Sequence, residues 1–106
     1  MKLVLSLALL IALGESAQGQ PAKTWKGFIT DTHCGTHCQR TSTMRPDLHC
    51  VRLCVKRGSK YGLWVDDKVY EIEPQAKASH FAAEEVTVTG QMTGDVIHIA
   101  SIHAAH

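Results

Sequence analysis

Two short segments decide most about how this chain folds: His33-Cys34-Gly35-Thr36-His37-Cys38 and His49-Cys50-Val51-Arg52-Leu53-Cys54. Together they contain all four cysteines of the 106-residue chain and three of its seven histidines. Thiolates and imidazoles are preferred ligands of zinc and copper in proteins. An even number of cysteines in a small exported domain is instead typical of a disulfide framework. The fold and the chemistry therefore both depend on how these cysteines are used.

The N-terminus predicts export. Met1-Lys2 is followed by an apolar run over residues 3–13 and by the small-residue sequence Ala17-Gln18-Gly19, the layout of a secretory signal peptide. The apolar run is shorter than the roughly 20 residues that span a bilayer. We therefore expect residues 1–19 to be a cleaved signal peptide, with no membrane anchor after cleavage. The mature domain, residues 20–106, is expected to be periplasmic or secreted.

The size and charge of the mature chain limit its function. A single domain this small obtains only marginal stability from an apolar core, so disulfides or a metal would add useful stability. The formal net charge of the full chain is +1, with acidic and basic residues interspersed. This charge gives no reason to expect nucleic acid as a partner.

The pattern of residues predicts a mainly β domain with one or two short helices. Asp47 is a suitable cap for a helix over residues 48–57, and Gly58 a suitable end. Pro74 ends a strand and precedes a short helix or turn over residues 76–83. Strands are predicted at residues 24–30, 60–65, 68–73, 86–89 and 96–102. Five short strands with helical insertions favour a small OB-like barrel, with a two-layer α+β sheet as the alternative.

Helical spacing restricts the disulfide pairing. Cys50 and Cys54 are four residues apart, so they lie on one face of the predicted helix. Regular helix geometry makes a bond between them unfavourable. Two pairings remain, and both join the loop cysteines Cys34 and Cys38 to the helix. Either pairing would staple the long polar loop to the barrel.

The same residues also predict a metal site. The candidate ligands are Cys34, His37, Cys50 and Cys54, with Cys38 and His49 as further candidates. Thiolates combined with imidazoles suit zinc or copper(I). The spacings match no standard zinc finger, c-type haem motif or thioredoxin-like Cys-x-x-Cys pair. Three arrangements remain open: two disulfides, one disulfide beside a Cys/His metal site, or a reactive thiol.

The chain also resembles an uncharacterised family of small exported bacterial domains. The segments that carry the resemblance are residues 27–35 (GFITDTHCG), 50–61 (CVRLCVKRGSKY), 68–72 (KVYEI) and 86–90 (VTVTG). The family pattern is Ser-Asp-x-x-Cys-Gly, Cys-x-x-x-Cys-Val-x-x-Gly and Val-x-Val-x-Gly. It includes Cys34, Cys50 and Cys54 and a histidine that His37 would match, whereas Cys38 lies outside it. The resemblance implies an OB-like fold, and its three cysteines favour one disulfide plus a thiol ligand.

These observations support three functional hypotheses. The first is an exported binding module with a Cys/His site for zinc or copper. The second is a disulfide-stapled recognition module for a peptide, glycan or partner protein. The third is a thiol redox protein, which needs a cysteine of lowered pKa. The sequence contains no phosphate loop or nucleophile elbow, so it favours binding over catalysis and identifies no partner.

Overall fold

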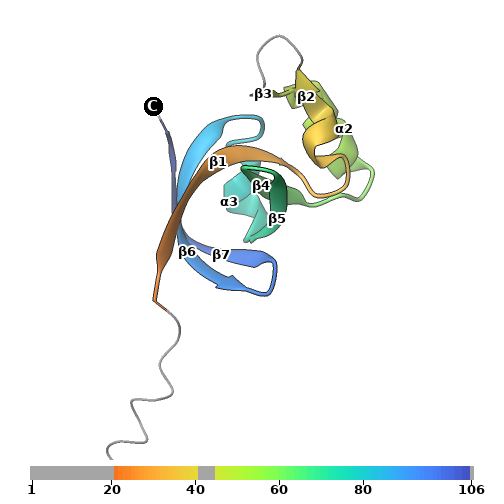
Figure 1. Ribbon diagram of the computed structural model, residues 1–106. Coiled ribbons are helices and arrows are strands. Elements are labelled where there is room, and N and C mark those ends of the chain that lie inside the picture. Colours follow the sequence, from red (N-terminus) through yellow and green to blue (C-terminus); the bar gives the residue numbers. More distant parts are fainter. Residues whose placement is uncertain (1–20, 41–44, 106) are drawn as a thin grey trace, which may run out of the picture.

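Five strands form a closed barrel in the computed structural model, which describes residues 21–40 and 45–105 (Figure 1). The predicted signal peptide at residues 1–19 lies outside the described residues. The barrel strands are β1 (Lys23–Asp31), β4 (Tyr61–Val65), β5 (Lys68–Glu73), β6 (Glu85–Thr93) and β7 (Val96–Ala104).

The strand order confirms the predicted OB-like barrel. Around the barrel the strands follow the order β1-β4-β5-β7-β6, and β6 pairs with β1 to close the ring. All neighbours are antiparallel except β5 and β7, which are parallel. Because the sheet closes on itself, the two-layer α+β alternative does not apply.

Alternating side chains fill the barrel. Along β6, Val86 and Val88 are buried, whereas Thr87 and Thr89 between them are partly exposed. The fully buried apolar core also includes residues from the other four strands: Ile29, Leu63, Ile72 and Ile97. At the bulge between Thr89 and Gly90, a Cβ on Gly90 would clash with the main-chain oxygen of His98. The barrel is therefore held by apolar burial from every strand.

The two α-helices lie where the sequence predicts helical segments. Helix α2 (Leu48–Lys56) begins at Asp47, whose side chain accepts a hydrogen bond from the His49 N–H. It ends before Gly58, which has a φ of 112°. Helix α3 (Gln75–Ser79) follows Pro74 and is shorter than the predicted segment 76–83. It lies against β4 and β5 and buries Ala78.

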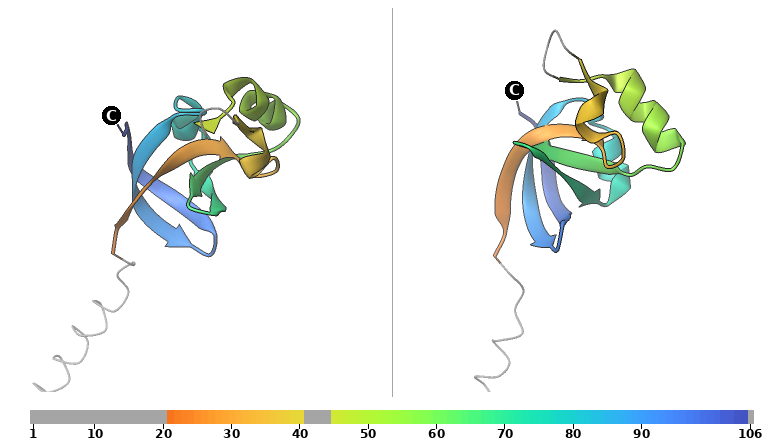
Figure 2. Two further views of the ribbon diagram at one scale, coloured as in Figure 1. Left: turned by 45° about the horizontal axis from the view of Figure 1, so that its top comes forward. Right: turned by 45° about the vertical axis from the view of Figure 1, so that its right-hand side comes forward.

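Residues 32–40 and 45–60, between β1 and β4, form a layer beside the barrel, which we call the stapled insertion (Figures 1 and 2). It contains the 3-10 helix η1 (Gly35–Cys38), the short strands β2 (Gln39–Arg40) and β3 (Arg45–Pro46), and α2. Arg52 of α2 donates a hydrogen bond to the Tyr61 hydroxyl of β4 over 2.9 Å. The insertion thus extends from one end of the barrel.

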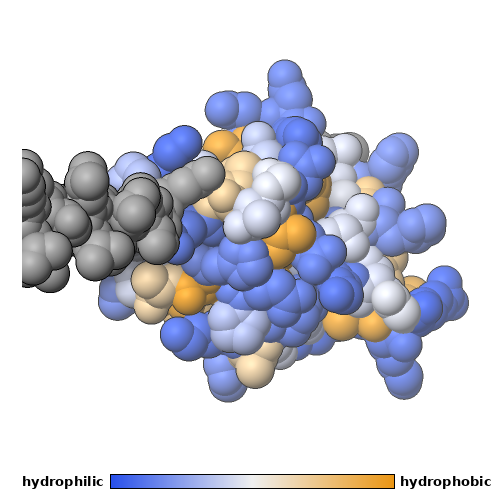
Figure 3. All heavy atoms as spheres, turned by 90° about the horizontal axis from the view of Figure 1, so that it is seen from below, coloured by the Kyte–Doolittle hydropathy of each residue, from blue (hydrophilic) through white to orange (hydrophobic). Residues whose placement is uncertain are grey.

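Among the described residues, no helix is long and apolar enough to cross a bilayer. On the face seen in Figure 3, hydrophobic residues lie alone or in small groups among hydrophilic ones, which is normal at a protein surface.

Candidate functional site

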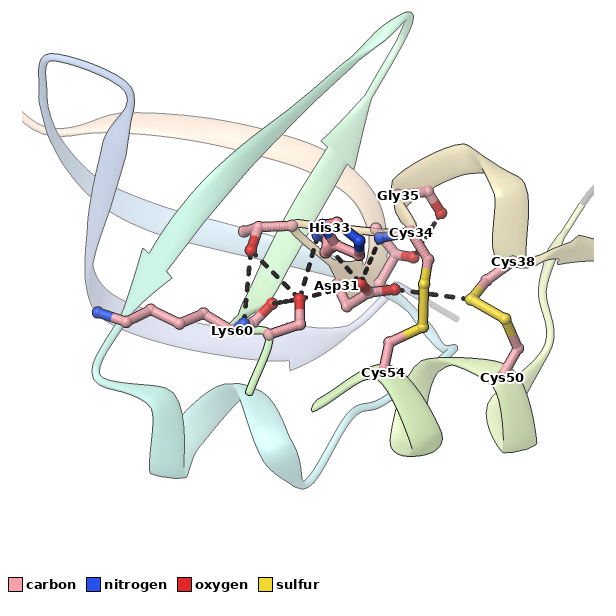
Figure 4. Close-up of a disulfide and its surroundings, with 11 residues drawn as sticks. Asp31, His33, Cys34, Gly35, Cys38, Cys50, Cys54 and Lys60 are labelled. Carbon is pink, nitrogen blue, oxygen red and sulfur yellow. Dashed lines mark hydrogen bonds between the residues drawn. A yellow bond between two sulfur atoms is a disulfide. The ribbon is translucent and has the colours of Figure 1, made fainter. Parts of the chain in front are cut away.

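Two disulfides join η1 and the residue before it to α2. Cys34 is bonded to Cys54 and Cys38 to Cys50, with Cα–Cα distances of 6.6 and 5.5 Å. Both bonds link the loop cysteines to the helix, as the sequence predicts, and Cys50 and Cys54 are not bonded to each other. The two bonds lie side by side between η1 and α2 (Figure 4). All four cysteines are therefore oxidised in this form, and none is a free thiol.

Asp31, the last residue of β1, lies against these disulfides and is fully buried (Figure 4). Its Oδ2 accepts three hydrogen bonds, from the main-chain N–H groups of His33 (3.0 Å) and Cys34 (2.7 Å) and from the Ser59 hydroxyl (3.0 Å). Several donors on one carboxylate oxygen offset the cost of burying it. Asp31 thus fixes the backbone turn that leads into the first cysteine.

Neighbouring residues tie the two ends of the insertion together at the same place. The N–H of Thr32 donates to the Lys60 carbonyl over 2.8 Å. The hydroxyl of Thr30, which is buried, donates to the Gly35 carbonyl over 3.0 Å. Gly35 has a φ of 53°, a conformation that glycine adopts without steric cost. The chain therefore leaves and re-enters the barrel at a single anchored point.

The structure brings together only part of the predicted metal-ligand set. Four potential ligands have donor atoms within 4.8 Å of one another: Asp31, Cys34, Cys38 and Cys54. Among the described residues, Cys50, His37 and His49 lie outside this cluster, and both histidines are exposed. In the oxidised form the three sulfurs of the cluster are bonded in disulfides, so they are not thiolate ligands.

A cleft opens at the base of the stapled insertion, and all of its lining residues belong to the two ends of the insertion. It has a volume of about 680 Å³, within the range of small-molecule sites. Cys34 and Cys54 form part of its wall, so the outer disulfide faces the cleft. The remaining lining residues supply hydroxyl, imidazole and cationic groups and no carboxylate: Thr32, His33, Arg57, Gly58, Ser59 and Lys60.

The two cations of the cleft differ in their pairing. Lys60 Nζ lies 3.3 Å from Glu71 and 3.6 Å from Glu73. The hydrogen bond to Glu71, with the negative charges of Glu71 and Glu73, raises the pKa of Lys60. Arg57 makes no ion pair with any described residue. Arg57 is therefore the cation best placed to meet an anionic ligand.

Sequence reasoning missed the central position of Asp31 and the part played by Ser59. Aspartate after a strand often accepts hydrogen bonds from the next main-chain N–H groups. Asp31 accepts such bonds from His33 and Cys34. Its complete burial against two disulfides depends on α2 folding back over the strand end. No local sequence pattern predicts that contact.

The chain matches no protein family, no curated protein and no solved structure. The resemblance to a family of exported bacterial domains therefore stays a prediction. The function has to be argued from the disulfides, the buried carboxylate and the cleft.

Proposed function

We propose that this protein is an exported recognition module whose cleft binds an acidic segment of a peptide partner. The observation that carries the proposal is the lining of the cleft. Arg57, Lys60 and His33 line it, and no carboxylate does. Arginine without an ionic partner is suited to bidentate recognition of a carboxylate. The disulfides hold this lining in place.

The position of the cleft agrees with how OB-like barrels are used. In such barrels the loop between the first and second strands borders the ligand-binding face. The stapled insertion occupies that place in this chain, between β1 and β4. This is an analogy between folds and supports the location of the site rather than the identity of its ligand.

Two disulfides are compatible with an oxidising compartment, which supports the proposed export. A cleft formed by a crosslinked loop keeps its shape without a ligand, so less conformational entropy is lost on binding. The oxidised chain is therefore the form expected to recognise a partner. The predicted zinc or copper site requires free thiolates and belongs to the reduced chain.

Binding of labelled peptides to the oxidised protein tests the proposal. We expect fluorescein-labelled hexaglutamate to bind more tightly than labelled hexaglutamine, with an affinity that falls as salt rises. Arg57→Gln should weaken hexaglutamate binding by about tenfold, the loss of roughly one charge-assisted hydrogen bond. Lys77→Gln is the matched control, because Lys77 is an exposed cation that lines a different hollow.

Equal affinity for the two peptides would refute an acidic ligand. An equal loss in the Arg57 and Lys77 variants would refute the cleft as its site, since it would indicate attraction by overall charge alone.

A further inference from the structure

The two carboxylate oxygens of Asp31 are in different environments. Oδ2 has three hydrogen-bond donors, whereas Oδ1 lies 3.6 Å from Cys38 Sγ. A disulfide sulfur carries no proton, so this is a contact and not a donated hydrogen bond. Oδ1 therefore accepts no hydrogen bond from a described residue, although Asp31 is fully buried. A buried carboxylate oxygen left in this way is unusual and calls for a ligand or proton in some state of the protein.

Three sulfurs surround that oxygen. A carboxylate oxygen of Asp31 and the sulfurs of Cys34, Cys38 and Cys54 all lie within 4.8 Å of one another. Ligand atoms around a tetrahedral zinc ion lie roughly 3.5–4 Å apart, given Zn–S bonds of about 2.3 Å. Once the disulfides are broken, the cysteine side chains are free to rotate toward that spacing. The cluster is also shielded from solvent, because Asp31 and Cys38 are buried.

We propose that the chain with both disulfides reduced binds one zinc ion through Asp31 Oδ1 and the thiolates of Cys34, Cys38 and Cys54. Each disulfide takes up two electrons and two protons from a dithiol reductant, which is itself oxidised to a disulfide. Zinc then displaces the protons of three thiols, and three protons are released to solvent. Cys50 remains outside the site as a thiol.

The surroundings of Asp31 favour zinc over copper(I). Copper(I) selects soft sulfur ligands, whereas zinc accepts a carboxylate oxygen together with thiolates. The hydrogen bonds from His33, Cys34 and Ser59 hold Oδ2 and so orient Oδ1 toward the sulfurs. Outer hydrogen bonds of this kind are usual around metal-bound carboxylates. The proposed set replaces two ligands predicted from the sequence, with Asp31 in place of His37 and Cys38 in place of Cys50.

Zinc and the disulfides are mutually exclusive, because they use the same sulfurs. Zinc would protect three thiols of a newly exported chain from random pairing. Oxidation by a disulfide-containing oxidant, which is itself reduced to a dithiol, would then release the ion as the two disulfides form. This inference does not depend on the cleft binding an acidic peptide, since it concerns the reduced chain, although Cys34 and Cys54 belong to both sites.

One pair of variants distinguishes a cysteine that binds zinc from a cysteine that only forms a disulfide. Cys38→Ser and Cys50→Ser break the same disulfide, so they remove the same crosslink. Only Cys38→Ser also removes a proposed ligand. The proteins are reduced with a phosphine under nitrogen and desalted, and zinc affinity is measured by competition with a chromophoric chelator.

We expect one equivalent of zinc in the reduced wild type and in Cys50→Ser, with dissociation constants within about threefold of each other. Cys38→Ser and Asp31→Asn should bind at least ~10-fold more weakly, as losses around metal sites typically do. His37→Ala should match the wild type, since its imidazole lies outside the cluster. Substitution with cobalt(II) gives a second measurement, because thiolate-to-cobalt absorption reports three sulfurs independently of affinity.

Two results would overturn the proposal. One is a reduced wild type that binds no stoichiometric zinc. The other is a Cys50→Ser variant that loses as much affinity as Cys38→Ser, which would assign the ligand role to Cys50. Neither result would affect peptide binding by the oxidised protein, so failure of this site and failure of the proposed function are distinguishable.

Discussion

The barrel and the stapled insertion are held together in different ways. The barrel buries apolar side chains from all five strands, including Ile29, Leu63 and Ile97. Few apolar side chains of the insertion are fully buried, and the leucines of α2, Leu48 and Leu53, are 48% and 36% exposed. In their place the insertion has two disulfides and a buried carboxylate. Covalent and polar contacts substitute for a core where the segment is too short to form one.

This difference explains why the candidate chemistry lies in the insertion. An apolar core tolerates few buried polar groups, because each must be paired. A segment built around Asp31 and four cysteines has donors, acceptors and sulfurs already close together. The barrel supplies a rigid frame on which such a site is positioned.

The largest effect is expected from the barrel core. Leu63→Ala removes a fully buried side chain and should lower the free energy of unfolding by about 2–5 kcal/mol. For a domain of this size that corresponds to a fall in Tm of roughly 10 °C or more, measured by thermal unfolding. Val51→Ala, which truncates a buried side chain of α2, is the control from the insertion. Val51 belongs to the same buried apolar cluster as Leu63, so a fall in Tm from Val51→Ala as large as that from Leu63→Ala would mean that the insertion contributes as much to this cluster as the barrel does.

On the stability of the barrel the disulfides are expected to have a smaller effect than Leu63→Ala, because they close loops within the insertion. The bonds close loops with sequence separations of 20 and 12 residues, and each is worth about 3 kcal/mol in the chain-entropy estimate. Reduction in the presence of a metal chelator should therefore open the insertion while the barrel stays folded. Hydrogen exchange followed by mass spectrometry should show faster exchange in α2 and unchanged protection in β6 and β7.

Double cysteine-to-serine variants test, without a reductant, whether the disulfides hold the insertion and not the barrel. Cys34→Ser with Cys54→Ser removes the bond that faces the cleft, and Cys38→Ser with Cys50→Ser removes the inner one. Each should accelerate exchange in α2, though less than full reduction does. Loss of protection in β6 and β7 would contradict the distinction between the barrel and the insertion, because the barrel would then depend on the disulfides.

The barrel could be predicted from the sequence more fully than the site. The strand at residues 68–73 has the predicted bounds, and helix α2 differs from the prediction by one residue at its end. These elements are set by local features, such as the alternation of Val86 and Val88 with threonines and the cap at Asp47. The restriction of the disulfides to loop–helix pairs also followed from helical spacing alone.

The choice between the two allowed pairings and the burial of Asp31 were not accessible from the sequence. Both depend on how α2 lies across η1, which places Cys54 near Cys34 and Cys50 near Cys38. The same placement excludes His37 and His49 from the cluster, although each is adjacent to a cysteine in the sequence. The closeness of cysteines and histidines in the sequence predicted which segment carries the candidate site. The packing of α2 determines which of their donor atoms come together.

The smallest effect is expected from the exposed ion pairs, which involve one lysine in each region. Lys60 joins the end of the insertion to Glu71 and Glu73 of β5, and Lys68 of the barrel lies 3.0 Å from Asp95 in the β6–β7 turn. The hydrogen bond to the carboxylate and its negative charge raise the pKa of each lysine in the folded state. A raised folded pKa adds stability below the pKa of the unfolded chain and loses it as pH rises through the folded value. The destabilisation caused by Lys60→Gln or Lys68→Gln should therefore be present at pH 8 and shrink above about pH 10.5, in urea unfolding curves.

Lys77→Gln serves as the control here too, because Lys77 makes no ion pair with any described residue and should show no such pH dependence. Hydrogen exchange adds the regional detail. Lys60→Gln should speed exchange near residues 59–61, where the insertion rejoins the barrel, and Lys68→Gln should do so in the β6–β7 turn. If the Lys60 variant instead accelerates exchange through β6 and β7, the junction is coupled to the whole barrel. The insertion would then be an integral part of the barrel's stability and not an appended layer.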